Sequence, residues 1–211
     1  MRGLPKFLLP CDTAYKTLIE NHVDHLLTVC EFIWIPTKPD FESLIHSLGL
    51  PTSRVKTLPM ITESMTQTIQ NVLKVDNSQF FQLIMPDTYF QGGLPYGVLD
   101  CEPDTADLAC WAIQDHQKGK LGQVNLIGDV VTDIQDKKLN CNYEHSWGAL
   151  TFNRSLLQFA KPSDPHIGFS VASAITSGER VTGTRISGKY YDCGTPDEYL
   201  SMLKENVLGL K

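Results

Sequence analysis

Short apolar runs alternate with amphipathic segments along most of this chain, and this alternation restricts the folds that it can adopt. The clearest apolar run, 80–85, carries one Gln and stops at Pro86, as a buried strand would. The segment 17–27 places its apolar residues at helical spacing and predicts an amphipathic helix. Further strands are expected at 32–35, 55–58, 108–113, 124–127, 130–134, 148–152 and 181–186, and further helices at 40–48, 63–73, 155–159, 167–176 and from Pro196. The alternation predicts an α/β fold, a doubly wound, mainly parallel mixed sheet with helices on both faces.

The composition narrows the class of protein. A chain of 211 residues predicts a single domain over 1–211. Its net charge of -6 argues against a nucleic-acid-binding surface, which needs a basic face. No apolar run approaches the roughly 20 residues that cross a bilayer, and the six cysteines form no Cys-x-x-Cys pair. We therefore expect a cytoplasmic protein with no nucleic-acid or membrane partner, and homo-oligomer formation is left open.

Two aspartates stand where the chain would leave the sheet. Asp87 follows the apolar run 80–85, and Asp192 precedes Gly194, Thr195 and Pro196. Ligands of α/β sheets bind outside the carboxyl ends of the strands, so both carboxylates could face a ligand. Each could equally serve a turn, with Thr195 as the N-cap of the last helix, and the two interpretations are compatible.

Two carboxylates at one site need a cation. At 4 Å and an effective dielectric constant of about 20, their repulsion costs roughly 4 kcal/mol. Mg²⁺ is the ion that usually offsets such charge where phosphates react, because it prefers oxygen ligands.

Four short stretches occur in a fixed order between residues 5 and 200. They are 5–10 (Pro-Lys-Phe-Leu-Leu-Pro), 83–90, 146–153, and 177–181 followed by 191–199. In this order they resemble the signatures of the sugar-1-phosphate nucleotidyltransferases. The resemblance implies the nucleotide-diphospho-sugar transferase fold. It also implies a reaction in which a nucleoside triphosphate and a sugar-1-phosphate give a nucleotide-sugar and pyrophosphate.

The resemblance also implies roles for individual residues. Asp87 and Asp192 would hold Mg²⁺, and Lys6 would neutralise phosphate charge as the third catalytic residue. Contacts with the two substrates are expected from Arg2, Ser64, Met65, Gln67, Lys137 and Gly148. Lys137 could instead be a solvated loop charge, and Gly148 could instead mark a strand bulge.

The chain departs from the family pattern at its start. The family's first strand and glycine-rich loop, which ends Gly-x-Gly-[Ser/Thr]-Arg, have no counterpart before Lys6. We therefore expect an N-terminally truncated domain. If the protein instead starts at Met1, Arg2 would partly replace the missing arginine. The central part of the chain also departs from the family pattern, because Asp136-Lys137-Lys138 stands where the family often has Glu-Lys-Pro.

Other functions fit the sequence less well but remain as alternatives. One is a catalytically silent domain that binds a nucleotide-sugar or a partner subunit, and another is a cytidylyltransferase for a non-sugar phosphate such as phosphocholine. A related glycosyltransferase would show Asp-x-Asp, which Asp87-Thr88-Tyr89 lacks. His22 and His25 share a helix face without a third ligand for a zinc motif, which predicts a surface pair.

Overall fold

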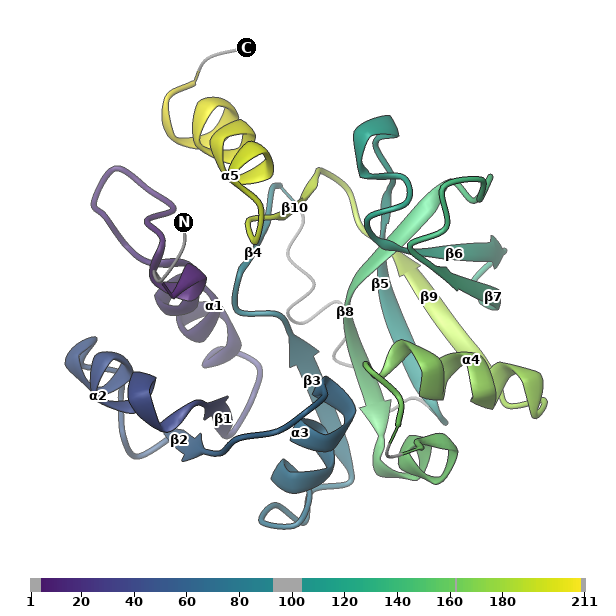
Figure 1. Ribbon diagram of the computed structural model, residues 1–211, viewed down its shortest axis with the longest axis horizontal. Helices are drawn as coiled ribbons and strands as arrows, with labels where there is room; N and C mark the ends of the chain where they lie inside the picture. Colours follow the sequence, from purple (N-terminus) through teal and green to yellow (C-terminus); the bar gives the residue numbers. More distant parts are fainter. Residues whose placement is uncertain (1–4, 93–103, 162, 210–211) are drawn as a thin grey trace. The chain divides into compact units, whose positions relative to one another are not determined.

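The computed structural model describes residues 5–92, 104–161 and 163–209. These residues divide into two compact units. Figure 1 shows their helices and strands, coloured along the sequence. As far as they are described, unit 1 comprises Met1–Ile61, Met85–Tyr96 and Gly188–Lys211, and unit 2 comprises Thr62–Ile84 and Gly97–Ser187. That 1–211 act together as one nucleotidyltransferase domain stays a prediction.

Unit 1 combines helices with two small sheets. The strands β1 (Ile33–Thr37) and β2 (Val55–Pro59) pair in parallel, whereas β4 (Thr88–Phe90) and β10 (Tyr190–Asp192) pair antiparallel. Its α-helices are α1 (Leu18–Leu26), α2 (Pro39–Ser47) and α5 (Pro196–Met202), with a 3₁₀ turn at Lys6–Leu8 and a π-helical turn at Leu203–Val207.

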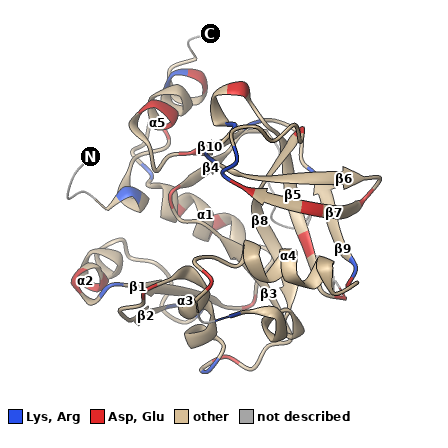
Figure 2. Ribbon diagram, turned by 45° about the vertical axis from the view of Figure 1, so that its right-hand side comes forward, with Lys and Arg blue, Asp and Glu red and all other residues tan. Residues whose placement is uncertain are grey.

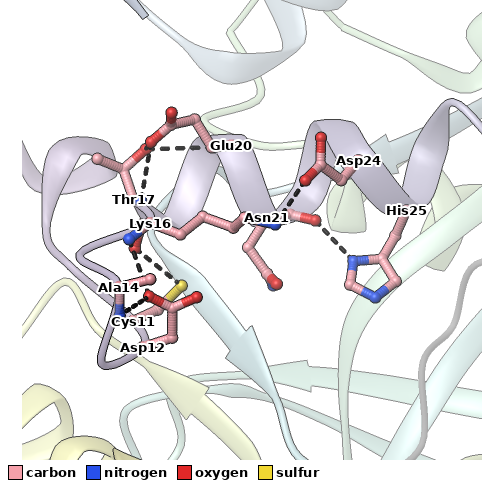
Figure 3. Close-up of polar contacts among 9 residues, drawn as sticks. All are labelled: Cys11, Asp12, Ala14, Lys16, Thr17, Glu20, Asn21, Asp24 and His25. Atoms are coloured by element: carbon pink, nitrogen blue, oxygen red, sulfur yellow. Dashed lines mark hydrogen bonds and ion pairs between the residues drawn. The ribbon is translucent and has the colours of Figure 1, made fainter.

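The helix α1 begins at a complete capping box. The Thr17 side chain accepts a hydrogen bond from the Glu20 N–H, and the Glu20 carboxylate accepts one from the Thr17 N–H (Figure 3). Lys16, which precedes the N-cap, pairs with Asp24 on the exposed face of the helix at 2.6 Å. The start of α1 is therefore fixed by local sequence, as the periodicity of 17–27 predicts.

Proline sets the start of α2 and α5. α2 begins at Pro39, one residue before the predicted stretch 40–48, and its N-cap is Lys38. Proline suits this first helical position because it has no backbone N–H, and an N–H there would have no partner within the helix. Acidic residues then occupy the first turn of both helices, where they complement the positive end of the helix dipole (Figure 2).

Two apolar clusters hold unit 1 together, and α1 contributes to both. Leu18 belongs to the cluster that contains Leu9, Cys11, Tyr191, Cys193 and Met202. Ile19 and Val23 belong to the cluster that contains Ile33, Ile35, Ile45 and Val55. Burying Leu, Ile and Val side chains contributes roughly 1.5–3 kcal/mol each. Hence α1 links the segment that carries Lys6 with the β1–β2 sheet.

Unit 2 is built on a six-stranded sheet with the order β3-β8-β5-β9-β7-β6. The strands are β3 (Phe80–Ile84), β5 (Ala106–Ala112), β6 (Gly122–Ile127), β7 (Val130–Asp136), β8 (His145–Asn153) and β9 (Val181–Arg185). β6 also pairs with the first residues of β8. The helices α3 (Met65–Val72) and α4 (Gly168–Thr176) pack their apolar residues into one core with the sheet, and 3₁₀ turns lie at Asp115–Gln117 and Arg154–Phe159.

The sheet direction differs from the expectation of a mainly parallel sheet. Among the described strands, only β1–β2 and β5–β9 pair in parallel, and the remaining pairs are antiparallel. One cause is the tight turn at Gly128, whose φ of 63° lets β6 return directly as β7. The α/β class and the mixed sheet agree with the prediction, while helices on both faces stay a prediction. In the described part of the chain, no helix has both the length and the apolar character that a membrane span requires.

The prediction for His22 is also wrong, since it is a buried residue and not half of a surface pair. Its side chain is only 3% exposed and packs against Phe90 with a ring separation of 5.4 Å. Burial lowers the pKa of His22 to about 4, so the imidazole is neutral at physiological pH.

This depressed pKa predicts acid lability. The unfolded chain takes up a proton near the ordinary pKa of 6.5, whereas the folded protein resists it down to about 4. Stability is therefore present above pH 6.5 and falls as the pH is lowered across this window, by about 3 kcal/mol. Urea unfolding at a series of pH values should show this loss in the parent and not in His22→Gln. His116→Gln, at an exposed position, is the control, and an unchanged acid limb in His22→Gln would contradict the assignment.

Candidate active site

Asp87 lies in a tight turn between β3 and β4. The turn is closed by the Thr88 hydroxyl, which donates to the Met85 carbonyl at 2.7 Å. Thr88 is almost fully buried and is the first residue of β4. The position of Asp87 is therefore set by its buried neighbour.

The β4–β10 pair brings the second aspartate to the same place. In its register Thr88 stands opposite Asp192, Tyr89 opposite Tyr191 and Phe90 opposite Tyr190. Asp87 precedes Thr88 directly, so the register places the two aspartates beside each other although 105 positions separate them in the sequence. A shift by one residue would turn the side chains of β10 to the opposite face.

Asp192 is oriented by the turn that follows it. Its Oδ1 accepts a hydrogen bond from the Gly194 N–H at 3.0 Å, and its carbonyl accepts one from the Thr195 N–H. Thr195 occupies the N-cap position of α5, as expected, but its side chain makes no capping hydrogen bond. Thr195 Oγ1 is buried and has no hydrogen-bond partner among the described residues.

Lys6 reaches the site from the 3₁₀ turn before α1. The Lys6 carbonyl accepts a hydrogen bond from the Leu9 N–H, and the Leu9 carbonyl accepts one from the Leu18 N–H at the start of α1. Leu9 and Leu18 are buried in the same cluster as Tyr191. An exposed lysine is thus held by an apolar anchor close to β10.

The three charged groups converge on Gly194. A Cβ placed on Gly194 would lie 2.7 Å from Asp192 Oδ1, 2.9 Å from Asp87 Oδ2 and 3.2 Å from Lys6 Nζ. The first two distances are shorter than any real Cβ contact. The bare backbone of Gly194 is therefore one wall of a small charged site, where glycine is needed for close approach.

The charges at this site act on one another. Burial raises the pKa of Asp87 above its ordinary value, the charge of Asp192 raises it further, and Lys6 opposes the rise. The ionised Asp87 is therefore under electrostatic stress that one lysine does not remove. A second cation would relieve that stress.

The donor set fits Mg²⁺. Asp87 and Asp192 offer the oxygen ligands that this ion prefers, on a wall free of side-chain atoms. Within the described ranges, no group of three or more His, Cys, Asp or Glu could hold a metal ion. A site with two carboxylates suits Mg²⁺, which is usually bound through one or two carboxylates together with phosphate and water oxygens.

The residues at the start of α3 that were predicted to bind substrate form hydrogen bonds within unit 2. Ser64 Oγ accepts from the Gln67 N–H, and Gln67 Oε1 accepts from the Glu63 N–H. The Met65 N–H donates to the Pro165 carbonyl at 3.1 Å. A contact with a nucleotide base would have to use other groups of this turn, so the role stays a prediction.

The other residues predicted to contact substrate, Gly148 and Lys137, differ in their burial and backbone conformation. Gly148 is buried at a bulge of β8, because Ala109 pairs with Ala149 whereas Cys110 pairs with Trp147. Lys137 is exposed just after β7, with a φ of 51°. The bulge agrees with one of the two interpretations of Gly148, and the contacts proposed for Gly148 and Lys137 stay predictions. Arg2 lies outside the described residues.

Sequence reasoning missed three contributors to the site. β4 is only three residues long, too short for an alternating pattern to show. Gly194 was interpreted only as part of a turn, because the Asp87 and Lys6 side chains that lie against it come from distant segments. His22, whose ring nitrogen lies 2.9 Å from the Thr88 carbonyl, gave no signal because its partner is 66 positions away.

Comparison with known proteins identifies the fold. Neither a scan against protein-family models nor a search of the curated proteins found a match. A UDP-glucose pyrophosphorylase complexed with UDP-glucose aligns over 96% of this chain and 90% of its own, with a TM-score of 0.75 and 15% identity. A protein described as a glucose-1-phosphate thymidylyltransferase from Bacillus anthracis, in complex with a sucrose, aligns over 93% of this chain and 84% of its own, with a TM-score of 0.77 and 15% identity. A UDP-glucose pyrophosphorylase in its apo form covers 96% and 90% at a TM-score of 0.73 and 16% identity.

These likenesses show that the chain has the fold of the sugar-1-phosphate nucleotidyltransferases, a nucleotide-diphospho-sugar transferase fold of the α/β class. They confirm, at the level of the fold, the resemblance drawn from the four sequence stretches.

The crowding at Gly194 predicts a selective defect. Gly194→Ala should displace the carboxylates and weaken the binding of Mn²⁺, a spectroscopic substitute for Mg²⁺, by at least about tenfold. Electron paramagnetic resonance of free Mn²⁺ would measure this. Gly183→Ala is the control, because its Cβ would meet the Leu126 side chain at 2.6 Å within unit 2. It should cost about 1–3 kcal/mol of stability and leave Mn²⁺ affinity unchanged.

The raised pKa of Asp87 predicts that removing its charge stabilises the folded protein, although the proposed metal site loses a ligand. A carboxyl whose pKa is raised in the folded state favours folding in its neutral form and opposes it once ionised. Asp87→Asn should therefore raise the free energy of unfolding at pH 7 by about 1 kcal/mol, without added metal. Asp104→Asn, at an exposed position, should change it little. A destabilised Asp87→Asn would contradict the electrostatic account.

Proposed function

We propose that this protein is a nucleotidyltransferase that joins a nucleoside triphosphate and a sugar-1-phosphate to give a nucleotide-sugar and pyrophosphate. The observation that carries the proposal is the convergence of Asp87, Asp192 and Lys6 around the backbone of Gly194. The fold shared with two UDP-glucose pyrophosphorylase structures supports it.

The reaction needs charge compensation more than a protein base. A phosphate oxygen of the sugar-1-phosphate attacks the α-phosphorus in line and forms the new P–O bond. The bond from that phosphorus to the bridging oxygen breaks, and pyrophosphate leaves with the electron pair. The nucleophile is already an anion, so no side chain has to remove a proton from it.

The residues of unit 1 supply the compensation. Lys6 Nζ faces the carboxylates with a charge suited to neutralise phosphate oxygens. Asp87 and Asp192 would hold Mg²⁺, which supplies charge stabilisation to the reacting phosphates when bound. A buried turn fixes the backbone at Asp87, and the Gly194 N–H orients the Asp192 carboxylate, so this part of the site would be preorganised for substrate.

The substrates are proposed by analogy. The similar structures are described as a UDP-glucose pyrophosphorylase and as a glucose-1-phosphate thymidylyltransferase. Glucose-1-phosphate with UTP or dTTP is therefore the first pairing to test. Contacts from Arg2, Ser64, Met65, Gln67, Lys137 and Gly148, and a cytoplasmic location, remain part of this proposal.

Pyrophosphate release tests the reaction. The protein should release pyrophosphate with Mg²⁺ and at least one pairing from a panel of nucleoside triphosphates and sugar-1-phosphates. Asp192→Asn should lose at least about 100-fold in turnover while remaining folded, the scale seen when an electrostatic group is removed from an active site. Asp24→Asn on the outer face of α1 is the matched control and should keep its activity.

Three results would contradict the proposal. Turnover of Asp192→Asn at the parent rate would exclude the metal-binding role. Release of pyrophosphate only from CTP with phosphocholine would favour the cytidylyltransferase alternative. Binding of a nucleotide-sugar without turnover in any pairing would favour the silent domain.

A further inference from the structure

His22 makes a directed hydrogen bond to the strand that follows Asp87. His22 Nε2 lies 2.9 Å from the Thr88 carbonyl oxygen, and both residues are buried. A carbonyl oxygen can only accept, so Nε2 carries the hydrogen and donates it. The bond joins α1 to β4 at the residue adjacent to Asp87.

Thr88 transmits this bond to the carboxylate in two ways. Its hydroxyl donates to the Met85 carbonyl and closes the turn that contains Asp87. Its backbone stands opposite Asp192 in the β4–β10 register. A shift of Thr88 would therefore move Asp87 relative to Asp192.

The helix that carries His22 also anchors Lys6. The Leu18 N–H at the start of α1 donates to the Leu9 carbonyl at 3.0 Å, and Thr17 forms a bridge with Pro10. The capping box at Thr17 fixes this end of the helix. One rigid element thus holds both the lysine segment and the Asp87 turn.

A space-filling role alone does not account for a histidine here. Burial of an imidazole costs free energy unless its polar atoms are bonded, and an apolar side chain would pack against Phe90 without that cost. The bond to Thr88 is a directional restraint that a leucine or phenylalanine would not provide.

From these contacts we infer that His22 is a positioning residue, which holds the Asp87 turn at the distance from Asp192 and Lys6 that the charged site requires. The inference rests on the proposed function. The hydrogen-bonding contacts described above join His22 to Thr88, and His22 acts through that residue.

The test measures Mn²⁺ affinity in the folded protein by electron paramagnetic resonance, without turnover. The amide nitrogen of Gln can occupy the place of His Nε2, whereas Asn is one methylene too short and Leu has no donor. We expect His22→Gln to bind Mn²⁺ within about threefold of the parent. His22→Asn and His22→Leu should bind at least about tenfold more weakly, the loss usual when a group that orients a metal ligand is removed.

Val23→Ala is the matched control. Val23 is the buried neighbour of His22 on α1 and belongs to the cluster around β1 and β2. Its truncation should lower the free energy of unfolding without changing Mn²⁺ affinity. A loss of affinity in Val23→Ala as large as in His22→Leu would show that general loosening is the cause, and would overturn the inference.

The outcomes separate the two proposals. If the parent binds Mn²⁺ and both His22→Asn and His22→Leu bind it equally well, the positioning role fails and the proposed function stands. If the parent binds no Mn²⁺, and Asp87→Asn and Asp192→Asn are folded and behave in the same way, the two carboxylates do not form a metal site. The positioning role of His22 is then excluded as well.

Discussion

The antiparallel pairing of β4 with β10 is the constraint on which the candidate site depends. It is only three residue pairs long, yet it brings Asp87 and Asp192 together against their mutual repulsion. So short a ribbon is not stable by itself in water. Its stability comes from the surroundings, since Tyr191 is buried with Leu9, Leu18 and Met202, and Phe90 packs on His22. Apolar packing therefore holds a charged site together.

Much of the fold follows from local pattern. The helix at 17–27 and the strand at 80–85 were predictable because their periodicity and stop signals are contained within a few residues. Strand direction was not, because an apolar run looks alike in parallel and antiparallel sheets. The predicted start of α2 was wrong by one residue, since Asp40 and Pro39 both suit a helix start and Pro39 occupies the first helical position.

The site was partly predictable for a different reason. Asp87 and Asp192 were found from their positions after predicted strands, and Lys6 from the resemblance to a family signature. The structure brings the three together. The residues that shape the site were missed because their partners are distant in sequence. His22 meets Thr88 across 66 positions, and the importance of Gly194 appears only when two side chains from other segments lie against it. No local pattern carries that information.

The way in which the two units share the chain has a consequence for the order of folding during synthesis. The described strands of unit 2 all precede residue 188, so a ribosome has translated that sheet before β10 emerges. Unit 1 is incomplete until the segment Gly188–Lys211 has been translated. Before that, Tyr89 and Leu18 lack the neighbours from β10 and α5 that cover them in the folded protein. The order of the chain therefore allows unit 2 to be complete while the apolar residues of unit 1 still lack their partners.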